Sequence, residues 1–167
     1  MQNTGTLKVE TRGDREVVMT RVFEAPAALV FEAFSRPELL MRWFGPRGWS
    51  LSQCEVDHRV GGAWRFVLRG PDGTETGGMR GVYRELQSPV RSVHTELFED
   101  YADAGESVVT ATFDEQGGTT TLTAIVEYPS REVRDFVVAS GMEHGAAESY
   151  DKLAELLAEL SPAQARA

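Results

Sequence analysis

The fold is decided by the stretch FEAPAALVFEAF at residues 23–34, which WFGP follows at residues 43–46. Proline is favoured in the first turn of a helix, because its fixed φ suits the helix and its missing N–H would have no partner there. After Pro26, apolar side chains recur at helical spacing from Leu29 to Phe34. The pattern predicts a strand, a short amphipathic helix and then a bulky aromatic turn.

The neighbouring sequence predicts a second short helix and a series of strands. Ser35 is placed to cap that helix and Pro37 to open it. Strands are predicted at about 16–24, 50–59, 63–69, 76–86, 91–98, 107–114 and 119–128. Short turns rich in glycine and proline separate the later strands, and such turns are typical of hairpins. We therefore expect an antiparallel meander.

After Tyr128 the apolar period changes from two residues to about three and a half. Ser130 is the expected N-cap of one long C-terminal helix. Its apolar face is predicted to carry Phe136, Met142, Ala146, Tyr150, Leu153, Leu157 and Leu160. This helix has to cover the concave side of the sheet, and its small residues Gly141, Gly145, Ala146 and Ala147 leave volume unfilled. The sequence thus predicts an internal cavity.

These motifs, together with DHRVGGAWRF at 57–66, GVY at 81–83 and GMEHG at 141–145, occur in a characteristic order. The chain resembles the SRPBCC (START-like, Bet v 1-like) superfamily, and within it the activator of Hsp90 ATPase homologue 1-like branch. The resemblance covers about residues 16–160. It implies an α+β helix-grip fold, in which a curved antiparallel β-sheet wraps around a long C-terminal helix, with two short helices after the first strand.

Composition limits the classes of function. The chain has 167 residues, 41% of them hydrophobic, and a net charge of −9, which indicates one globular domain at 16–160 and argues against a nucleic-acid partner. We expect residues 1–15 to be a polar segment that frays or forms an edge strand, and residues 161–167 to be a flexible tail. Without a signal-peptide pattern or an apolar run of membrane-span length, a cytoplasmic location is expected.

The turn at Gly61-Gly62 predicts a register for the two strands beside it. If it is a two-residue loop, Arg59 opposes Trp64 and Asp57 opposes Phe66, so all four side chains share one face. The aromatic pair is expected to face the interior, which would place Asp57 and Arg59 on the cavity wall. There they either orient a polar group of a ligand or form a structural ion pair.

Other cavity candidates come from the aromatic turn, from the strands and from the last helix: Trp43, Phe44, Tyr83, Met142, Ala146 and Tyr150. The aromatic residues beside Gly45-Pro46 could form a lid over a pocket. Equally, Trp43 could simply cap the core. A tyrosine suits an apolar wall that must offer one hydrogen bond, and it also suits ordinary core packing.

The sequence contains few residues in patterns typical of metal binding or catalysis. His144 and Glu148 stand one helical turn apart but have no recognisable third ligand, so we predict no metal and no cofactor. Cys54 is the only cysteine and is interpreted as a small buried apolar residue. The sequence contains no nucleophile elbow and no phosphate-binding loop.

Two classes of function therefore compete. The first is binding of a small apolar or ring-containing molecule in the cavity, such as a lipid, a polyketide or an aromatic metabolite. The second is a cyclase or aromatase that uses Asp, Arg and Tyr of the cavity wall, as the resemblance implies for some relatives. Contact with Hsp90, carried by the family name, is a third reading that we do not expect, because an additional N-terminal domain of the eukaryotic activator is absent. A homodimer remains open.

Overall fold

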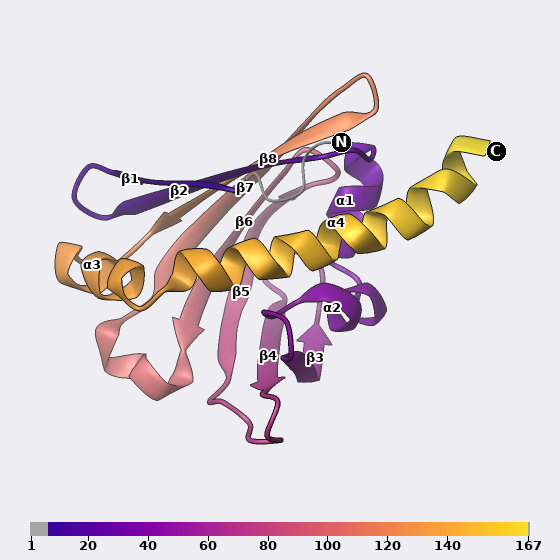
Figure 1. The fold of residues 1–167 in the computed structure, drawn as a ribbon. Coiled ribbons are helices and arrows are strands. Elements are labelled where there is room, and N and C mark those ends of the chain that lie inside the picture. The colour runs from indigo at the N-terminus through magenta and orange to yellow at the C-terminus, as the bar shows by residue number, and fades with distance from the viewer. Residues whose placement is uncertain (1–6, 167) are drawn as a thin grey trace.

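A curved antiparallel sheet with a long helix across its concave face forms the protein (Figure 1). The computed structural model describes the backbone of residues 7–166 and the side chains of residues 7–161. The elements are, in order, β1 (Lys8–Arg12), β2 (Glu16–Phe23), α1 (Ala27–Ala33), α2 (Pro37–Trp43), β3 (Ser50–Val56), β4 (Ala63–Arg69), β5 (Met79–Gln87), β6 (Arg91–Phe98), η1 (Glu99–Ala104), β7 (Ser107–Gln116), β8 (Thr119–Glu127), α3 (Arg131–Ala139) and α4 (Met142–Arg166).

The eight strands follow the order β1-β2-β8-β7-β6-β5-β4-β3, and every neighbouring pair is antiparallel. Strands β3 to β8 are neighbours both in sequence and in the sheet, as expected for a meander joined by short turns. The hairpin of β1 and β2 completes the sheet by pairing β2 with β8. The predicted helix-grip fold is confirmed.

The first short helices begin close to where the sequence predicts them. Pro26 is the N-cap of α1, and Pro37 is the first residue of α2. The predicted role of Ser35 is wrong, because the N-cap of α2 is Arg36 and makes no side-chain cap bond. Instead, the Ser35 hydroxyl donates to the carbonyl of Phe31 at 3.2 Å, so it satisfies a group at the end of α1.

The predicted single C-terminal helix is divided in two. Ser130 caps α3 as predicted and accepts a hydrogen bond from the backbone N–H of Val133. Gly141 then adopts a φ of +89°, a left-handed conformation that ends the helix and favours glycine. The chain turns there before α4 begins. Phe136 consequently leaves the predicted apolar face and is 60% exposed.

The C-terminal half of α4 belongs to the core rather than to the cavity. Leu153, Leu156 and Leu157 are at most 3% exposed, and they pack in one cluster with α1, α2 and the sheet. Nearby, the side chain of Arg21 on β2 is completely buried and forms an ion pair with Asp151 of α4 at 3.0 Å. This pair joins the helix to the sheet close to the middle of α4.

Regular elements reach close to both ends of the described chain. Residues 1–6 of the polar N-terminal segment lie outside the described residues, whereas residues 8–12 form the edge strand β1. At the other end, the backbone of α4 continues to Arg166, past residue 160, where the sequence placed the domain boundary. The alanines in that segment have high helix propensity. No helix within the described part of the chain is long and apolar enough to cross a bilayer.

Candidate functional site

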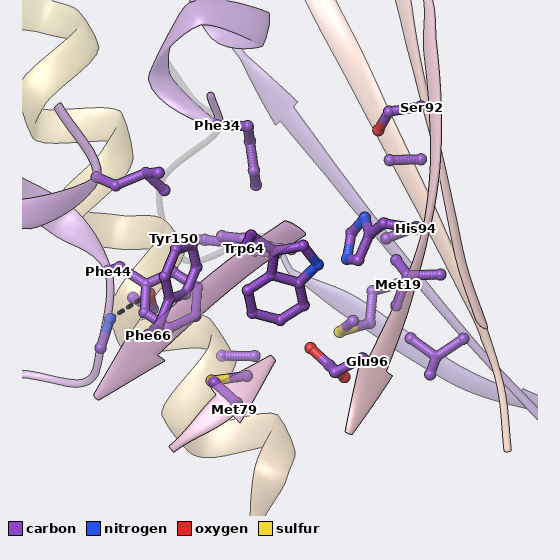
Figure 2. Close-up of a pocket in the computed structure, with 18 of the residues that line it drawn as sticks. Met19, Phe34, Phe44, Trp64, Phe66, Met79, Ser92, His94, Glu96 and Tyr150 are labelled. Carbon is purple, nitrogen blue, oxygen red and sulfur yellow. Dashed lines mark hydrogen bonds between the residues drawn. The ribbon is translucent and has the colours of Figure 1, made fainter. Parts of the chain in front are cut away.

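A cavity of about 430 Å³ lies between the sheet and the first half of α4 (Figure 2). Its walls are predominantly apolar and come from almost every element of the fold. The aromatic and sulfur-containing lining residues are Met19, Phe31, Phe34, Trp43, Phe44, His58, Trp64, Phe66, Met79, Tyr83, His94, Phe98, Phe113, Tyr128, Met142 and Tyr150. A cavity of this size and polarity is typical of sites for small organic molecules.

Most of the residues predicted from the sequence do line this cavity. The group comprises Trp43, Phe44, Trp64, Phe66, Tyr83, Met142, Ala146 and Tyr150. Gly145 and Ala146 bring the backbone of α4 close to the cavity, because neither has a side chain large enough to fill it. Of the four small residues that were predicted to leave space, Gly145 and Ala146 line the cavity, whereas Gly141 and Ala147 are not among its lining residues.

Asp57 and Arg59 are not part of the cavity wall, and the predicted register is wrong. Strand β3 ends at Val56, and Val56 rather than Arg59 opposes Trp64. The segment that follows folds on itself and then joins β5, where the backbone N–H of Gly61 donates to the carbonyl of Tyr83 at 2.8 Å.

The two charged residues therefore extend beyond the end of the strand. Their side chains are 51% and 70% exposed for Asp57 and Arg59, respectively, and form an ion pair at 3.0 Å. An exposed pair of this kind contributes little to stability. It also cannot orient a group inside the cavity.

The aromatic turn after α2 is fixed to α4. The indole of Trp43 donates to the carbonyl of Ala33 at 2.9 Å and is 1% exposed. Ser149 on α4 accepts a hydrogen bond from the backbone N–H of Gly45 at 3.0 Å, and the Lys152 ammonium donates to the carbonyl of Gly45 at 3.1 Å. Trp43 thus caps the core and lines the cavity at the same time.

Trp64 occupies its position because its partner in the sheet is a glycine. Gly81 on β5 is directly opposite Trp64. A β-carbon at Gly81 would stand 1.8 Å from the carbonyl oxygen of Thr95 and 2.6 Å from the indole nitrogen of Trp64. That nitrogen donates to the Thr95 carbonyl at 3.2 Å. Glycine at 81 is what allows the indole to cross β5 and form part of the cavity wall.

The polar part of the cavity was not predicted from the sequence. Ser92, His94 and Glu96 alternate along β6, and all three line the cavity. Burial lowers the pKa of His94 to about 4, so the imidazole is neutral near pH 7. Burial also raises the pKa of Glu96 to about 7. A strand thus carries three polar side chains into an otherwise apolar space.

Three tyrosines complete the polar groups. Burial raises the pKa of Tyr150 to about 12, and it also raises the pKa of Tyr83 and of Tyr128. All three are therefore neutral phenols at physiological pH. Tyr83 also packs edge-on against His58, with ring centres 5.1 Å apart. Both rings line the cavity.

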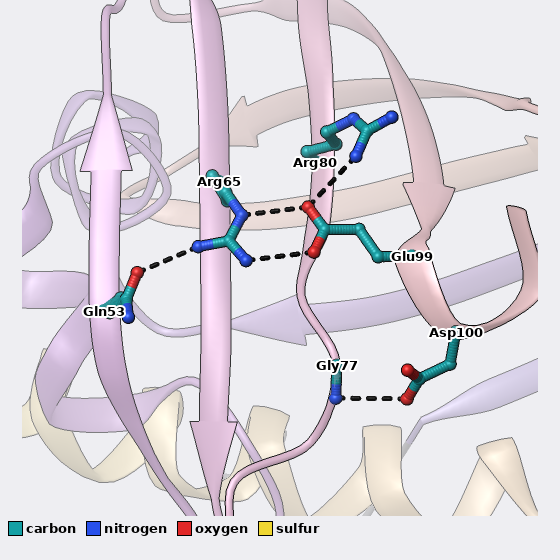
Figure 3. A network of polar contacts seen from close by, with 6 residues as sticks. All are labelled: Gln53, Arg65, Gly77, Arg80, Glu99 and Asp100. Atoms are coloured by element: carbon teal, nitrogen blue, oxygen red, sulfur yellow. Dashed lines mark hydrogen bonds and ion pairs between the residues drawn. The ribbon is translucent and has the colours of Figure 1, made fainter.

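On the opposite face of the sheet, an ionic network joins the strands β3, β4 and β5 to Glu99 at the start of η1 (Figure 3). Arg65 on β4 donates two hydrogen bonds of 2.9 Å to Glu99 and one of 2.9 Å to Gln53 on β3. Arg80 on β5 also contacts Glu99, at 3.2 Å. The hydrogen bonds from Arg65 lower the pKa of Glu99 to about 2. The network fixes the ends of β5 and β6 that carry the cavity residues Met79 and Phe98.

Three further residues singled out from the sequence, His144, Glu148 and Cys54, have ordinary surroundings. His144 and Glu148 contact each other at 3.3 Å on α4, and within the described residues no group of three potential metal ligands occurs. Cys54 packs partly buried against the core, and burial raises the pKa of its thiol to about 11. A thiol with that pKa is protonated and unreactive near neutral pH.

The fold defines the class of protein: a helix-grip protein, here with a pocket between its sheet and α4. The family model described as Activator of Hsp90 ATPase homolog 1-like protein matches residues 24–158. The chain belongs to this family, as its sequence motifs predicted.

Solved structures agree with that assignment. A Rhodobacter sphaeroides protein is 30% identical, with a TM-score of 0.83 over 92% of this chain and 99% of its own. A Nitrosomonas europaea protein is 26% identical, with a TM-score of 0.80 over 90% and 99%, respectively. An Hsp90 activator from Plasmodium falciparum shares the fold at 22% identity, with a TM-score of 0.58 over 78% and 89%. No curated protein sequence matches the chain.

Proposed function

We propose that the protein binds a small, largely apolar molecule in the cavity between the sheet and α4. The observation that supports this most directly is the cavity itself, about 430 Å³ in volume and lined mainly by aromatic and aliphatic side chains. Protein interiors are usually packed without voids of this size. An empty space bounded by apolar side chains forgoes packing contacts that a ligand would restore.

The shape of the lining favours a molecule with a ring. Aromatic side chains surround the space from several sides, with Phe44 and Phe66 5.1 Å apart and Trp64 and Phe66 4.8 Å apart between ring centres. Rings of a ligand can pack edge-on or offset against such side chains. The polar groups of β6 lie on one wall only, so the ligand is expected to carry its polar group at one side.

The family name raises contact with Hsp90 as a different class of function. The Plasmodium activator shares the fold at 22% identity, a level that supports common architecture and no more. Ligand binding rests on features within this chain, and it is the function we propose.

Acid–base catalysis in the same cavity is a second candidate, and the particular observation in its favour is the Glu96 carboxyl with a pKa of about 7. A group that titrates near the working pH can both accept and donate a proton. The two candidates differ in the fate of the ligand, because a binding protein releases its ligand chemically unchanged and an enzyme converts it into a product. Mass spectrometry of the ligand before and after incubation separates the two candidates.

The binding proposal is tested with the neutral solvatochromic dye prodan. We expect one dye molecule per native chain, a blue-shifted emission and a Kd in the micromolar range, which corresponds to about −8 kcal/mol. Native mass spectrometry of the purified protein is expected to show a co-purifying small molecule that prodan displaces. A dye that fails to bind the native protein at concentrations of about a hundred micromolar would overturn the proposal.

A further inference from the structure

Glu96 is an acidic side chain that points into an apolar space. It lies on β6 and extends into the cavity that Met19, Trp64 and Met79 also line (Figure 2). The accessible part of its side chain faces the cavity. Its surroundings there are protein atoms rather than bulk water. A carboxylate in such a position loses hydration and needs hydrogen-bond donors in its place.

No donor within the described residues supplies that replacement. Among residues 7–161, whose side chains the structure describes, none forms a hydrogen bond or an ion pair with the Glu96 carboxyl group. His94 on the same strand is neutral. The phenols of Tyr128 and Tyr150 face Glu96 closely enough for its charge to raise their pKa further, after burial. Arg21, a buried cation whose charge also acts on Tyr150, pairs with Asp151.

The remaining neighbours of Glu96 suit a positive charge rather than a negative one. The ring of Trp64 on β4 and the phenol of Tyr150 on α4 both line the cavity, and the faces of aromatic rings attract cations. A ligand with a carboxylate would instead meet repulsion from Glu96. The net charge of −9 adds a general attraction for cations.

We propose that the cavity takes an apolar, ring-containing amine whose ammonium group is seated on the carboxylate of Glu96. This inference rests on the proposed function and adds the chemical class of the ligand. The ammonium donates hydrogen bonds to the carboxylate, and the rest of the molecule fills the apolar volume toward Phe44 and Phe66. A charge-assisted hydrogen bond of this kind, shielded from water, is stronger than one between neutral groups.

The experiment compares three naphthalene probes of nearly equal size: naphthylmethylamine, naphthylmethanol and naphthoic acid. Their affinities are measured by fluorescence titration with the wild-type protein, with Glu96→Gln and with the control Glu10→Gln. Glu10 is an exposed residue of the edge strand β1, so its substitution removes the same charge far from the cavity. Circular dichroism and thermal unfolding verify that each variant is folded.

For the wild type and Glu10→Gln, we expect the amine to bind about ten- to a hundredfold more tightly than the alcohol. The acid should bind most weakly. In Glu96→Gln the advantage of the amine over the alcohol should disappear, while the affinity of the alcohol stays within about threefold of wild type. The affinity of the amine for the wild type should also decrease below about pH 7, where Glu96 gains a proton, and the affinity of the alcohol should not.

Equal affinities of amine and alcohol for the wild type would overturn the inference and leave the proposed function intact. A preference for the amine that persists in Glu96→Gln would likewise overturn it, because another group would then hold the ammonium. If none of the three probes binds, the proposed function fails and the inference fails with it.

Discussion

Filling the cavity from α4 provides a direct test of whether the space exists. Ala146 lies on α4 and lines the cavity, so Ala146→Leu adds three carbon atoms to the empty side of the helix. Each newly buried methyl or methylene group contributes about 0.8 kcal/mol, or about 2 kcal/mol for three. Ordering the leucine side chain costs about 0.5–1 kcal/mol. We therefore expect a net gain in unfolding free energy of about 1–2 kcal/mol.

The same substitution should weaken ligand binding. The leucine takes volume from any molecule in the cavity, and a ligand that loses the burial of three carbon atoms loses about 2 kcal/mol of binding free energy. This corresponds to a Kd about thirtyfold higher. Stability and affinity are thus predicted to change in opposite directions, which general damage to the fold cannot produce.

The assay pairs urea denaturation with prodan titration. Ala158→Leu is the matched control, since Ala158 is exposed on the same helix. It is expected to change stability by less than about 0.5 kcal/mol and to leave the affinity for prodan unchanged. The reasoning would be refuted if Ala146→Leu lost about 1–3 kcal/mol of stability with prodan affinity unchanged. That result would mean that protein atoms already fill the space and that the leucine overpacks it.

Two further predictions concern the same interior. Folding raises the pKa of Glu96 from 4.5 to about 7, so the wild type should lose stability as the pH rises through this window. Above about pH 7, Glu96→Gln should therefore be more stable than the wild type by up to about 3 kcal/mol. Below pH 4.5 it should be no more stable than the wild type. Parallel denaturation curves at all pH values would contradict this. Leu157→Ala should lower the unfolding free energy measured by urea titration by about 2–5 kcal/mol, because Leu157 is 2% exposed in the core cluster. The affinity for prodan should stay within about threefold of the wild-type value. A loss of unfolding free energy below about 1 kcal/mol would show that this half of α4 is loosely packed.

Much of the fold could be predicted because its signals are local. Pro26 and Pro37 mark two helix starts, and the glycine- and proline-rich turns separate strands that pair with their neighbours in sequence. The pairing of β2 with β8 joins residues about a hundred positions apart, and no local pattern carries it.

The break at Gly141 shows the limit of periodicity. Apolar residues on both sides of it continue at a spacing compatible with one helix, so the pattern by itself predicts no interruption. The glycine was interpreted as a means of leaving space, whereas its φ of +89° ends α3. Glycine is the common residue just after a helix end, and that signal could have located the break.

The error at Asp57 and Arg59 has a different origin. A strand register depends on the length of the turn, and one turn of different geometry changes which residues oppose each other. Two glycines in sequence suggested a two-residue loop. In the structure the backbone N–H of Gly61 bonds to Tyr83 on β5 and not to β3. The geometry of this turn therefore depends on β5, a strand that follows later in the sequence. The local pattern around Gly61 carries no information about that strand.

The polar cavity residues of β6 were not predicted, because on this strand the polar face points toward the cavity and not toward solvent. Alternation places Val93 on one face and His94 and Glu96 on the other, and the usual rule assigns the polar face to solvent. Here the polar residues face the cavity. The rule assumes that the inner face of a sheet packs against apolar side chains, and this condition fails where α4 presents Gly145 and Ala146. The small residues of α4 and the polar residues of β6 therefore line one and the same space, in which the Glu96 carboxyl has no hydrogen-bond or ion-pair partner among the described residues.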